Sequence, residues 1–297
     1  MDTAGSYRVR FAQLQARYRR EVGVWDWKGF TTWLISLFAT MRPATRRQYR
    51  AAVVFVLSEQ RVQGVEELVA RLRTPVQSST RLPRRTSSMK AKTMSKRDWL
   101  FLAMSLKESN GRWDMLAYQW IFWGMRTGLR PVEWQRATLA TDASHGYGFA
   151  LHVANAKHSQ GRAHGPERIL HLRLDPDEAG ALLQFMHVVQ ASYSQAYAGC
   201  RGAVSRAARA LWPQRRDPPT LYTARHQFCA DLKASGLALP DIAALMGHAS
   251  VHTNQQHYGK RRCGRAEGIV VEADERDVTR VRERMQRDNP PNFGLAR

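Results

Sequence analysis

The chain has 297 residues, of which 43% are hydrophobic, and this is enough apolar material for two domains with cores of their own. Its 46 Lys and Arg residues against 25 Asp and Glu residues give a formal net charge of +21. A field of this sign and size favours a polyanionic partner, nucleic acid above all, over a small neutral metabolite, and the alternative is a basic protein with no such partner.

The cysteines and the apolar runs narrow the class further. Three widely spaced cysteines predict neither a disulfide framework nor a zinc site, and they fit a reducing compartment. The N-terminus lacks the apolar core of a signal peptide, and the longest apolar run, Ala51–Leu57, is too short to span a bilayer. We therefore expect an intracellular protein that has no membrane contact and holds no metal.

Two helices are predicted in the first part of the chain. Apolar and aromatic residues between Trp25 and Leu37 recur at three- and four-residue steps, as on a helix face that packs against a core. After a turn at 41–43, a second helix begins near Thr45, with an apolar side and an arginine-rich side. That arginine-rich side fits contact with phosphates about as well as it fits a solvated surface.

A basic segment follows these helices. From Val69 to Arg97 there is no Asp or Glu, and the stretch is rich in Lys, Arg, Ser and Thr with two prolines. Such a composition predicts an extended linker, which its charge would hold against DNA. We place a helical DNA-binding domain at 1–74, the linker at 75–94, a catalytic domain at 95–262 and a tail at 263–297. The side chains expected on DNA are Arg46, Arg47, Arg50, Arg84, Arg85, Lys90 and Lys92.

The pattern after the linker predicts a mainly α fold with a small antiparallel β-sheet. Ser95 caps a helix that reaches about Lys107, and a second helix from about Trp113 to Arg126 is ended by Gly128. Tyr147–Val153 and Arg168–Leu172 form a hairpin with a long polar tip. Further helices are expected at about 177–193, 203–211, 223–235 and 241–246, and an amphipathic one in the tail around Val278, Val281 and Met285.

Two segments place basic side chains where they could act on a phosphate. Arg130 comes just after the glycine break at Gly128, and Glu133, three residues on, could hold its guanidinium. Lys157 lies in the tip of the predicted hairpin. Taken alone, each has an ordinary interpretation: a surface arginine at a helix end and a solvated loop lysine.

Two later segments add further polar groups. Tyr222 and Arg225 are one helical turn apart, on a helix whose other side is apolar at Phe228. His248 follows a glycine, as helix C-caps often do, and Tyr258 stands near the end of the predicted domain. Each of these is also common in ordinary packing.

In this order the motifs resemble the tyrosine recombinase family, also called lambda-type integrases. The family pattern is T-G-L-R-x-x-E, a hairpin lysine, H-x-x-R-H, L-G-H-x-S and a late tyrosine, and the resemblance covers about Ser95–Lys260. The helical N-terminal region with its basic linker is similar to the family's core-binding domain. The resemblance implies the catalytic set Arg130, Lys157, Tyr222, Arg225, His248 and Tyr258, supported by Glu133, His226 and His257.

The resemblance also implies a chemistry that needs no cofactor. Arg130 and Arg225 would clamp the non-bridging oxygens of the scissile phosphate, while Tyr258 attacks phosphorus and stores the bond energy in a phosphotyrosine. Lys157 would protonate the leaving 5′ oxygen, and His248 would support the phosphate or the nucleophile.

The chain departs from the family pattern at two places. Tyr222 stands where the family usually has histidine, and a phenol donates a hydrogen bond but is a poor base near neutral pH. His248 and Tyr258 are ten residues apart, one more than in many members.

The implied partners are duplex DNA with specific sites and three further copies of the chain, in a tetramer on two DNA sites. The resemblance also fits accessory DNA-bending proteins and a cytoplasmic, nucleoid-associated location. It leaves open whether the protein serves the integration, the excision or the resolution of a mobile element. Two alternatives remain: relaxation of DNA as a type IB topoisomerase, and a non-catalytic DNA-binding accessory factor on the same fold. The apolar tail favours a protomer–protomer contact and hence the recombinase.

Overall fold

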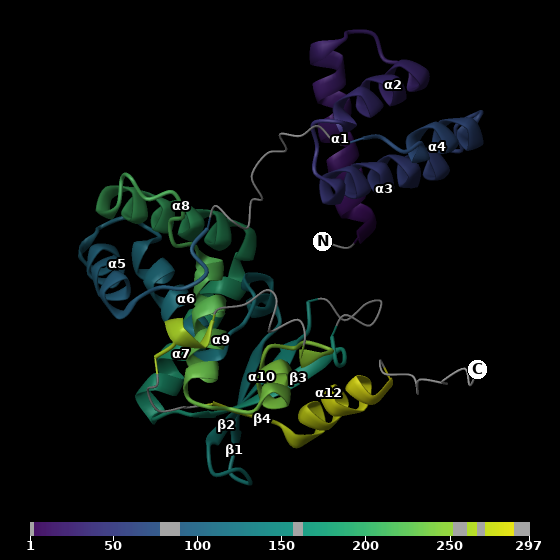
Figure 1. Cartoon of the computed structure of the whole chain (residues 1–297). Helices are drawn as coiled ribbons and strands as arrows, with labels where there is room; N and C mark the ends of the chain where they lie inside the picture. Colours follow the sequence, from purple (N-terminus) through teal and green to yellow (C-terminus); the bar gives the residue numbers. More distant parts are fainter. Residues whose placement is uncertain (1–2, 78–89, 157–162, 252–259, 266–270, 288–297) are drawn as a thin grey trace, which may run out of the picture. The chain divides into compact units, whose positions relative to one another are not determined.

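The computed structural model describes residues 3–77, 90–156, 163–251, 260–265 and 271–287. The chain divides into two compact units, Met1–Arg85 and Thr86–Arg297, whose elements are labelled in Figure 1. The division falls inside the segment that the sequence assigns to the linker. None of the helices in the described residues is both long and apolar enough to cross a membrane.

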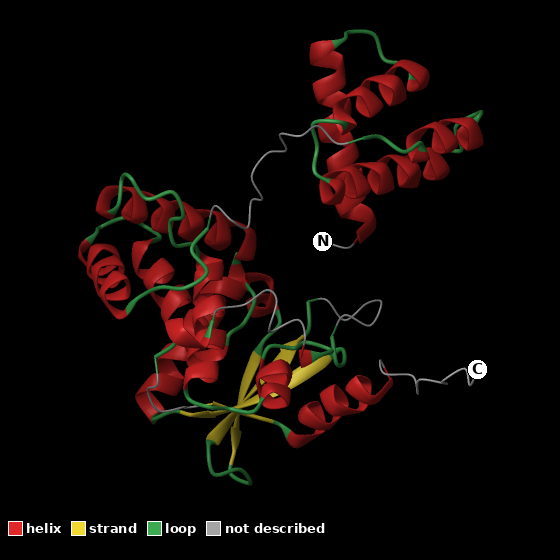
Figure 2. Ribbon diagram, in the orientation of Figure 1, coloured by secondary structure: helices red, strands yellow, loops and turns green. Residues whose placement is uncertain are grey.

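In its described residues the first unit consists of helices joined by loops, as Figure 2 shows. Its core is aromatic: the buried ring of Phe30 lies 5.8 Å from that of Phe11 and 5.6 Å from that of Tyr18. Edge-to-face pairs of this kind add to the burial of apolar area. The sequence patterns predict the second and third helices and miss the first and fourth. The helices are α1 (Thr3–Glu21), α2 (Trp27–Phe38), α3 (Pro43–Glu59) and α4 (Val65–Arg73).

The arginines of α3 do not share one surface. Arg47 is exposed, and the guanidinium of Arg50 lies 5.6 Å from the ring centroid of Phe38. Arg46, predicted to lie on DNA, is instead buried, and it donates to the carbonyl oxygens of Met41 (2.9 Å) and Val76 (2.7 Å). Because its donors are used inside the unit, Arg46 ties the end of the helical domain to α3 and is removed from the predicted DNA surface.

The second unit places helices around one small sheet (Figure 1). The four strands pair antiparallel in the order β1-β2-β3-β4. The strands are β1 (Thr138–Asp142), β2 (Gly148–Ala154), β3 (Glu167–Arg173) and β4 (Val271–Ala273). The helices are α5 (Lys96–Glu108), α6 (Asp114–Thr127), α7 (Pro176–Ala191), α8 (Tyr193–Leu211), α9 (Leu221–Ala234), α10 (Leu239–Leu245) and α12 (Glu275–Arg287). The predicted fold class and the β2–β3 hairpin are confirmed.

Helices α6 and α9 form the centre of this unit. They approach so closely that a Cβ on Gly124 would lie 2.9 Å from the Cβ of Ala224. One turn further along, Gly128 takes a left-handed φ of +67° with the ring of Phe228 directly above it. This packing places the chain after α6 beside α9, and the motifs at 127–133 and 222–228 therefore meet.

The last strand and helix change the interpretation of the tail. Strand β4 pairs with β3 of the same chain, and the side chains of Val271, Val278 and Val281 are buried in the unit's own core. These three residues belong to the tail segments that favoured a protomer–protomer contact and are already covered, while Ile269 and Val270 of the same tail lie outside the described residues.

The end of the predicted linker belongs to the second unit. Ala91 and Met94 are buried, the Ala91 N–H donates to the carbonyl oxygen of Pro218 (3.2 Å), and the Met94 N–H donates to the side-chain oxygen of Gln227 (2.7 Å). These bonds explain why a segment of linker composition is nevertheless packed at its C-terminal end.

Candidate functional site

Arg130 is held by the geometry of the turn after α6. Gly128 ends the helix in a left-handed conformation, and its N–H donates to the Gly124 carbonyl oxygen (3.0 Å). Pro131 then starts a short 3₁₀ turn, Pro131–Gln135. The Arg130 N–H donates to Glu133 Oε2 (2.7 Å) while its Nη1 lies 2.5 Å from Glu133 Oε1, and both side chains are buried. The predicted support of Arg130 by Glu133 is thus present.

Glu133 is the common partner of three arginines. Besides Arg130, Nη2 of Arg168 lies 2.9 Å from Oε2 and Nη1 of Arg225 lies 3.7 Å from it. Burial alone would raise the pKa of this carboxyl, but Arg168, Arg130 and Arg225 together hold it well below its usual range. Glu133 is therefore a carboxylate near neutral pH.

Arg225 reaches the same cluster from the first turns of α9. The helix starts at Leu221, and the Thr220 N–H donates to the Thr223 hydroxyl (2.9 Å). The buried Arg225 side chain donates to the carbonyl oxygens of Gly128 and Met246, each at 2.5 Å. Arg225 therefore joins the turn that carries Arg130 to the segment that carries His248.

His248 enters the cluster through a glycine turn after α10. Gly247 has a φ of +62°, its N–H donates to the Ala244 carbonyl oxygen (2.9 Å), and the His248 N–H donates to that of Ala243 (2.9 Å). The buried His248 ring places Nε2 3.2 Å from Nη2 of Arg225. Because a guanidinium only donates, this contact needs a lone pair on Nε2, which assigns the neutral tautomer with its proton on Nδ1.

Tyr222 and His226 lie on the same helix, both half-buried, with ring centroids 5.3 Å apart. Burial, followed by Arg225 and Lys92, lowers the pKa of His226 to about 4. The imidazole is therefore neutral near pH 7 and a poor proton acceptor there, so it is suited to accept a hydrogen bond, whereas the Tyr222 phenol mainly donates one.

The cluster carries more positive than negative charge. Three buried guanidiniums face one carboxylate, and carbonyl oxygens around them offset part of the excess. The Nε of Arg130 is buried and has no hydrogen-bond partner among the described residues. A preorganised, water-excluded group of donors with an excess of positive charge is suited to stabilise an anion.

Several predicted residues lie outside the described residues: Arg84, Arg85, Lys157, His257 and Tyr258. Lys90 and Lys92 are described and exposed. The structure thus brings together Arg130, Glu133, Arg225 and His248. Tyr222 and His226 lie next to each other on α9, the helix that also carries Arg225.

Sequence reasoning missed Arg168 and Asn155. Both are buried, and Arg168 Nη1 donates to the side-chain oxygen of Asn155. A signal was present, because Arg168 shares the period-two register of Leu170 and Leu172, whose side chains face the core. A charged residue at an inward strand position indicates a buried partner.

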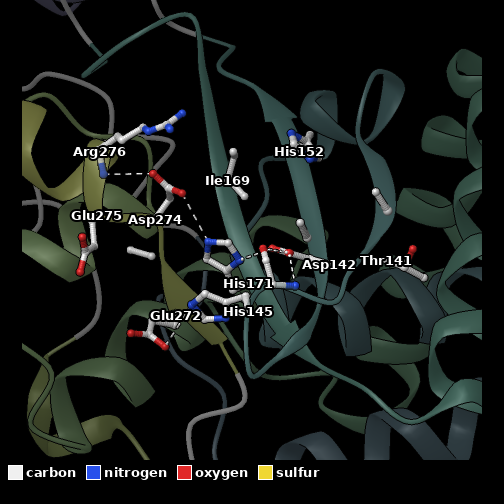
Figure 3. A pocket seen from close by; sticks show the side chains of 14 residues that line it. Thr141, Asp142, His145, His152, Ile169, His171, Glu272, Asp274, Glu275 and Arg276 are labelled. Carbon is white, nitrogen blue, oxygen red and sulfur yellow. Dashed lines mark hydrogen bonds and ion pairs between the residues drawn. The ribbon is translucent and has the colours of Figure 1, made fainter.

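A pocket of about 490 Å³ lies on the face of the sheet opposite to the side chain of Arg168. His171 stands there between Asp142 and Asp274, with each ring nitrogen 3.4 Å from a carboxylate oxygen, as Figure 3 shows. The ring of His145 stacks on that of His171 with centroids 3.8 Å apart. Since strand side chains alternate, this pocket is separated from Arg168 and the arginine cluster by the sheet itself.

Comparison with known proteins gives structural likenesses alone. No protein-family model matches the chain, and no curated protein matches it. The Tn1549 transposon integrase in complex with circular intermediate DNA is similar over 97% of this chain and 95% of its own, at 12% identity and a TM-score of 0.45. The XerA recombinase is similar over 97% of this chain and 99% of its own, at 16% identity and a TM-score of 0.38. The XerH site-specific recombinase bound to a palindromic difH substrate is similar over 86% of this chain and 75% of its own, at 16% identity and a TM-score of 0.46. These three solved structures are one integrase and two recombinases.

Proposed function

We propose that this protein is a site-specific DNA recombinase that cleaves and rejoins strands through a 3′-phosphotyrosine formed on Tyr258. The observation that carries the proposal is the buried cluster of Arg130 and Arg225 on Glu133, with His248 against Arg225. The net charge of +21 supplies the general attraction to DNA.

In the proposed reaction the Tyr258 hydroxyl gives up its proton to water, and its oxygen bonds to phosphorus while the bond from phosphorus to the 5′ oxygen breaks. Negative charge grows on the non-bridging oxygens, and the guanidiniums of Arg130 and Arg225 offset it. Removing one such donor typically costs two to three orders of magnitude in rate. Lys157 gives its proton to the 5′ oxygen, and the neutral imidazole of His248 holds the Arg225 guanidinium in place. Religation runs the same steps in reverse, so no nucleotide cofactor is consumed.

The test is covalent trapping with a nicked duplex from which the cleaved fragment diffuses away. The probe is a pool of such duplexes with randomised positions around the nick. The wild-type chain is expected to form a denaturation-resistant adduct, Tyr258→Phe to form none, and Tyr147→Phe, a tyrosine outside the cluster, to behave as wild type. An adduct that survives in Tyr258→Phe contradicts the assignment of Tyr258 as the nucleophile. No adduct with wild type contradicts the proposal and favours the accessory-factor alternative.

One observation bears on the choice between the recombinase and the topoisomerase alternative. The apolar side chains of Val271, Val278 and Val281 are covered within their own chain, so they supply no argument for a tetramer. The proposed tetramer on two DNA sites therefore needs its own test: sedimentation with and without a trapped two-site duplex. Relaxation of a supercoiled plasmid by a monomer, without exchange between two sites, would support the topoisomerase.

A further inference from the structure

Arg168 is the most completely enclosed cation of the cluster. Its side chain has no exposed surface, and each guanidinium nitrogen has a protein acceptor. Nε donates to the Leu245 carbonyl oxygen (2.9 Å), Nη1 to the Asn155 side chain and Nη2 to Glu133 (2.9 Å). A group so fully engaged is suited to hold other parts of the site and not to bind a phosphate itself.

The partners of Arg168 include the neck of the β2–β3 hairpin. Asn155, at the end of β2, closes that neck: its N–H donates to the Pro166 carbonyl oxygen (2.7 Å) and its side-chain amide to that of Gly165 (3.0 Å). The Ala156 N–H lies 3.4 Å from Oε1 of Glu133. The neck is therefore fixed to Glu133 twice, directly through Ala156 and through Arg168, and the next residue in the sequence is Lys157.

Gly247 adds a third segment to the same point. A Cβ there would lie 2.5 Å from the Asn155 side-chain oxygen and 2.8 Å from Nη1 of Arg168. The backbone that presents His248 thus passes directly over the pair. Arg168 joins the turn of Arg130, the hairpin neck and the His248 segment at one buried position.

We propose that Arg168 is a positioning residue for strand cleavage: by fixing the hairpin neck at Asn155 and Ala156 to the Glu133 carboxylate, it supports proton delivery by Lys157, the next residue in the sequence. This inference rests on the proposed function, in which Lys157 protonates the leaving 5′ oxygen. Arg168 itself touches neither the phosphate nor the nucleophile.

The readout that separates positioning from general support is the leaving group. In a duplex whose 5′ bridging oxygen is replaced by sulfur, the bond from phosphorus to sulfur breaks and a thiolate leaves unprotonated, because a thiol has a pKa of about 8.5, far below that of an alcohol. A defect in proton delivery is relieved on this substrate, whereas a defect in phosphate clamping persists. Two reference variants define these outcomes: Lys157→Ala should cleave slowly only when the leaving atom is oxygen, and Arg130→Ala should cleave both duplexes slowly.

The experiment compares single-turnover cleavage of the oxygen and sulfur duplexes, using a sequence obtained from the trapping pool. Arg168→Met is expected to slow cleavage of the oxygen duplex by about a hundredfold, in the range of a lost general acid, and to cleave the sulfur duplex within about threefold of wild type. Arg126→Met, which breaks the pair of Arg126 with Glu178 in the same unit, is the matched control and should leave both rates unchanged.

A second variant guards against loss of the fold. Asn155→Ala removes one acceptor of Arg168 and one bond of the neck while leaving the cluster's charges intact, and it should give the same selective defect at smaller size. Equal slowing of both substrates by Arg168→Met and Asn155→Ala, or no slowing, overturns the positioning role while cleavage by wild type stands. Failure of wild type to cleave either duplex overturns the proposed function and this inference together.

Discussion

Replacing Glu133 by glutamine tests the electrostatic balance of the cluster directly. The side chain keeps its size, so the change removes one negative charge from among three buried guanidiniums at 2.5, 2.9 and 3.7 Å. Removing one partner of a buried ion pair costs about 3–5 kcal/mol, because the remaining charge is left uncompensated. We expect Glu133→Gln to lose about that much free energy of unfolding at pH 7, measured by urea denaturation.

The pH dependence gives the prediction its sign. The folded-state pKa of Glu133 lies below its ordinary value, so its contribution is fully present above about pH 4.5 and is lost as the pH falls through the folded pKa. The gap between wild type and Glu133→Gln should therefore narrow below pH 4.5. Glu178→Gln, which breaks a partly exposed pair with Arg126, is the control and should cost less than about 1 kcal/mol. A Glu133→Gln loss no larger than that of Glu178→Gln, or a gap that widens in acid, would refute the reasoning.

Three further outcomes are expected. Gly247→Ala combines a φ of +62° with a clash against Asn155 and Arg168, so its midpoint of thermal unfolding should fall and its cleavage should slow, as calorimetry and the trapping assay would register. A maleimide should label one cysteine per native chain, the exposed Cys263, and three cysteines after denaturation. Burial shields Cys200 and Cys229 and raises the pKa of their thiols to about 12 and about 11. Labelling of two cysteines in the native chain would contradict this. Since the folded-state pKa of His226 is lowered to about 4 from 6.5, its contribution to stability is complete above pH 6.5 and falls away towards pH 4. Between pH 7 and pH 5 the free energy of unfolding of wild type should therefore fall by up to about 2 kcal/mol more than that of His226→Gln in urea melts.

The elements that local patterns define were predictable. Ser95 accepts from the Asp98 N–H as the expected cap, Gly128 ends α6, and alternation in 148–154 and 167–173 places the hairpin. Strand β4 was not predictable, because its three residues gain their structure from pairing with β3, about a hundred residues earlier in the chain. Helix α1 was missed because its buried residues, Phe11, Leu14 and Tyr18, are diluted by many charged ones.

The difference between Arg46 and Arg130 shows where sequence reasoning reaches its limit. Both are arginines near a turn beside a helix, and both are buried with their donors directed into the protein. Arg46 donates to the backbone oxygens of Met41 and Val76 and serves its own unit. Arg130 instead shares a carboxylate with two other arginines, which leaves an excess of positive charge that an incoming phosphate can offset. Local spacing cannot distinguish the two cases, because what separates them is the number of cations that distant segments bring to one acceptor. The ordered motif set named two of those segments, through Arg130 and Arg225. It missed Arg168, whose inward strand register indicated a buried partner but did not identify Glu133 as that partner.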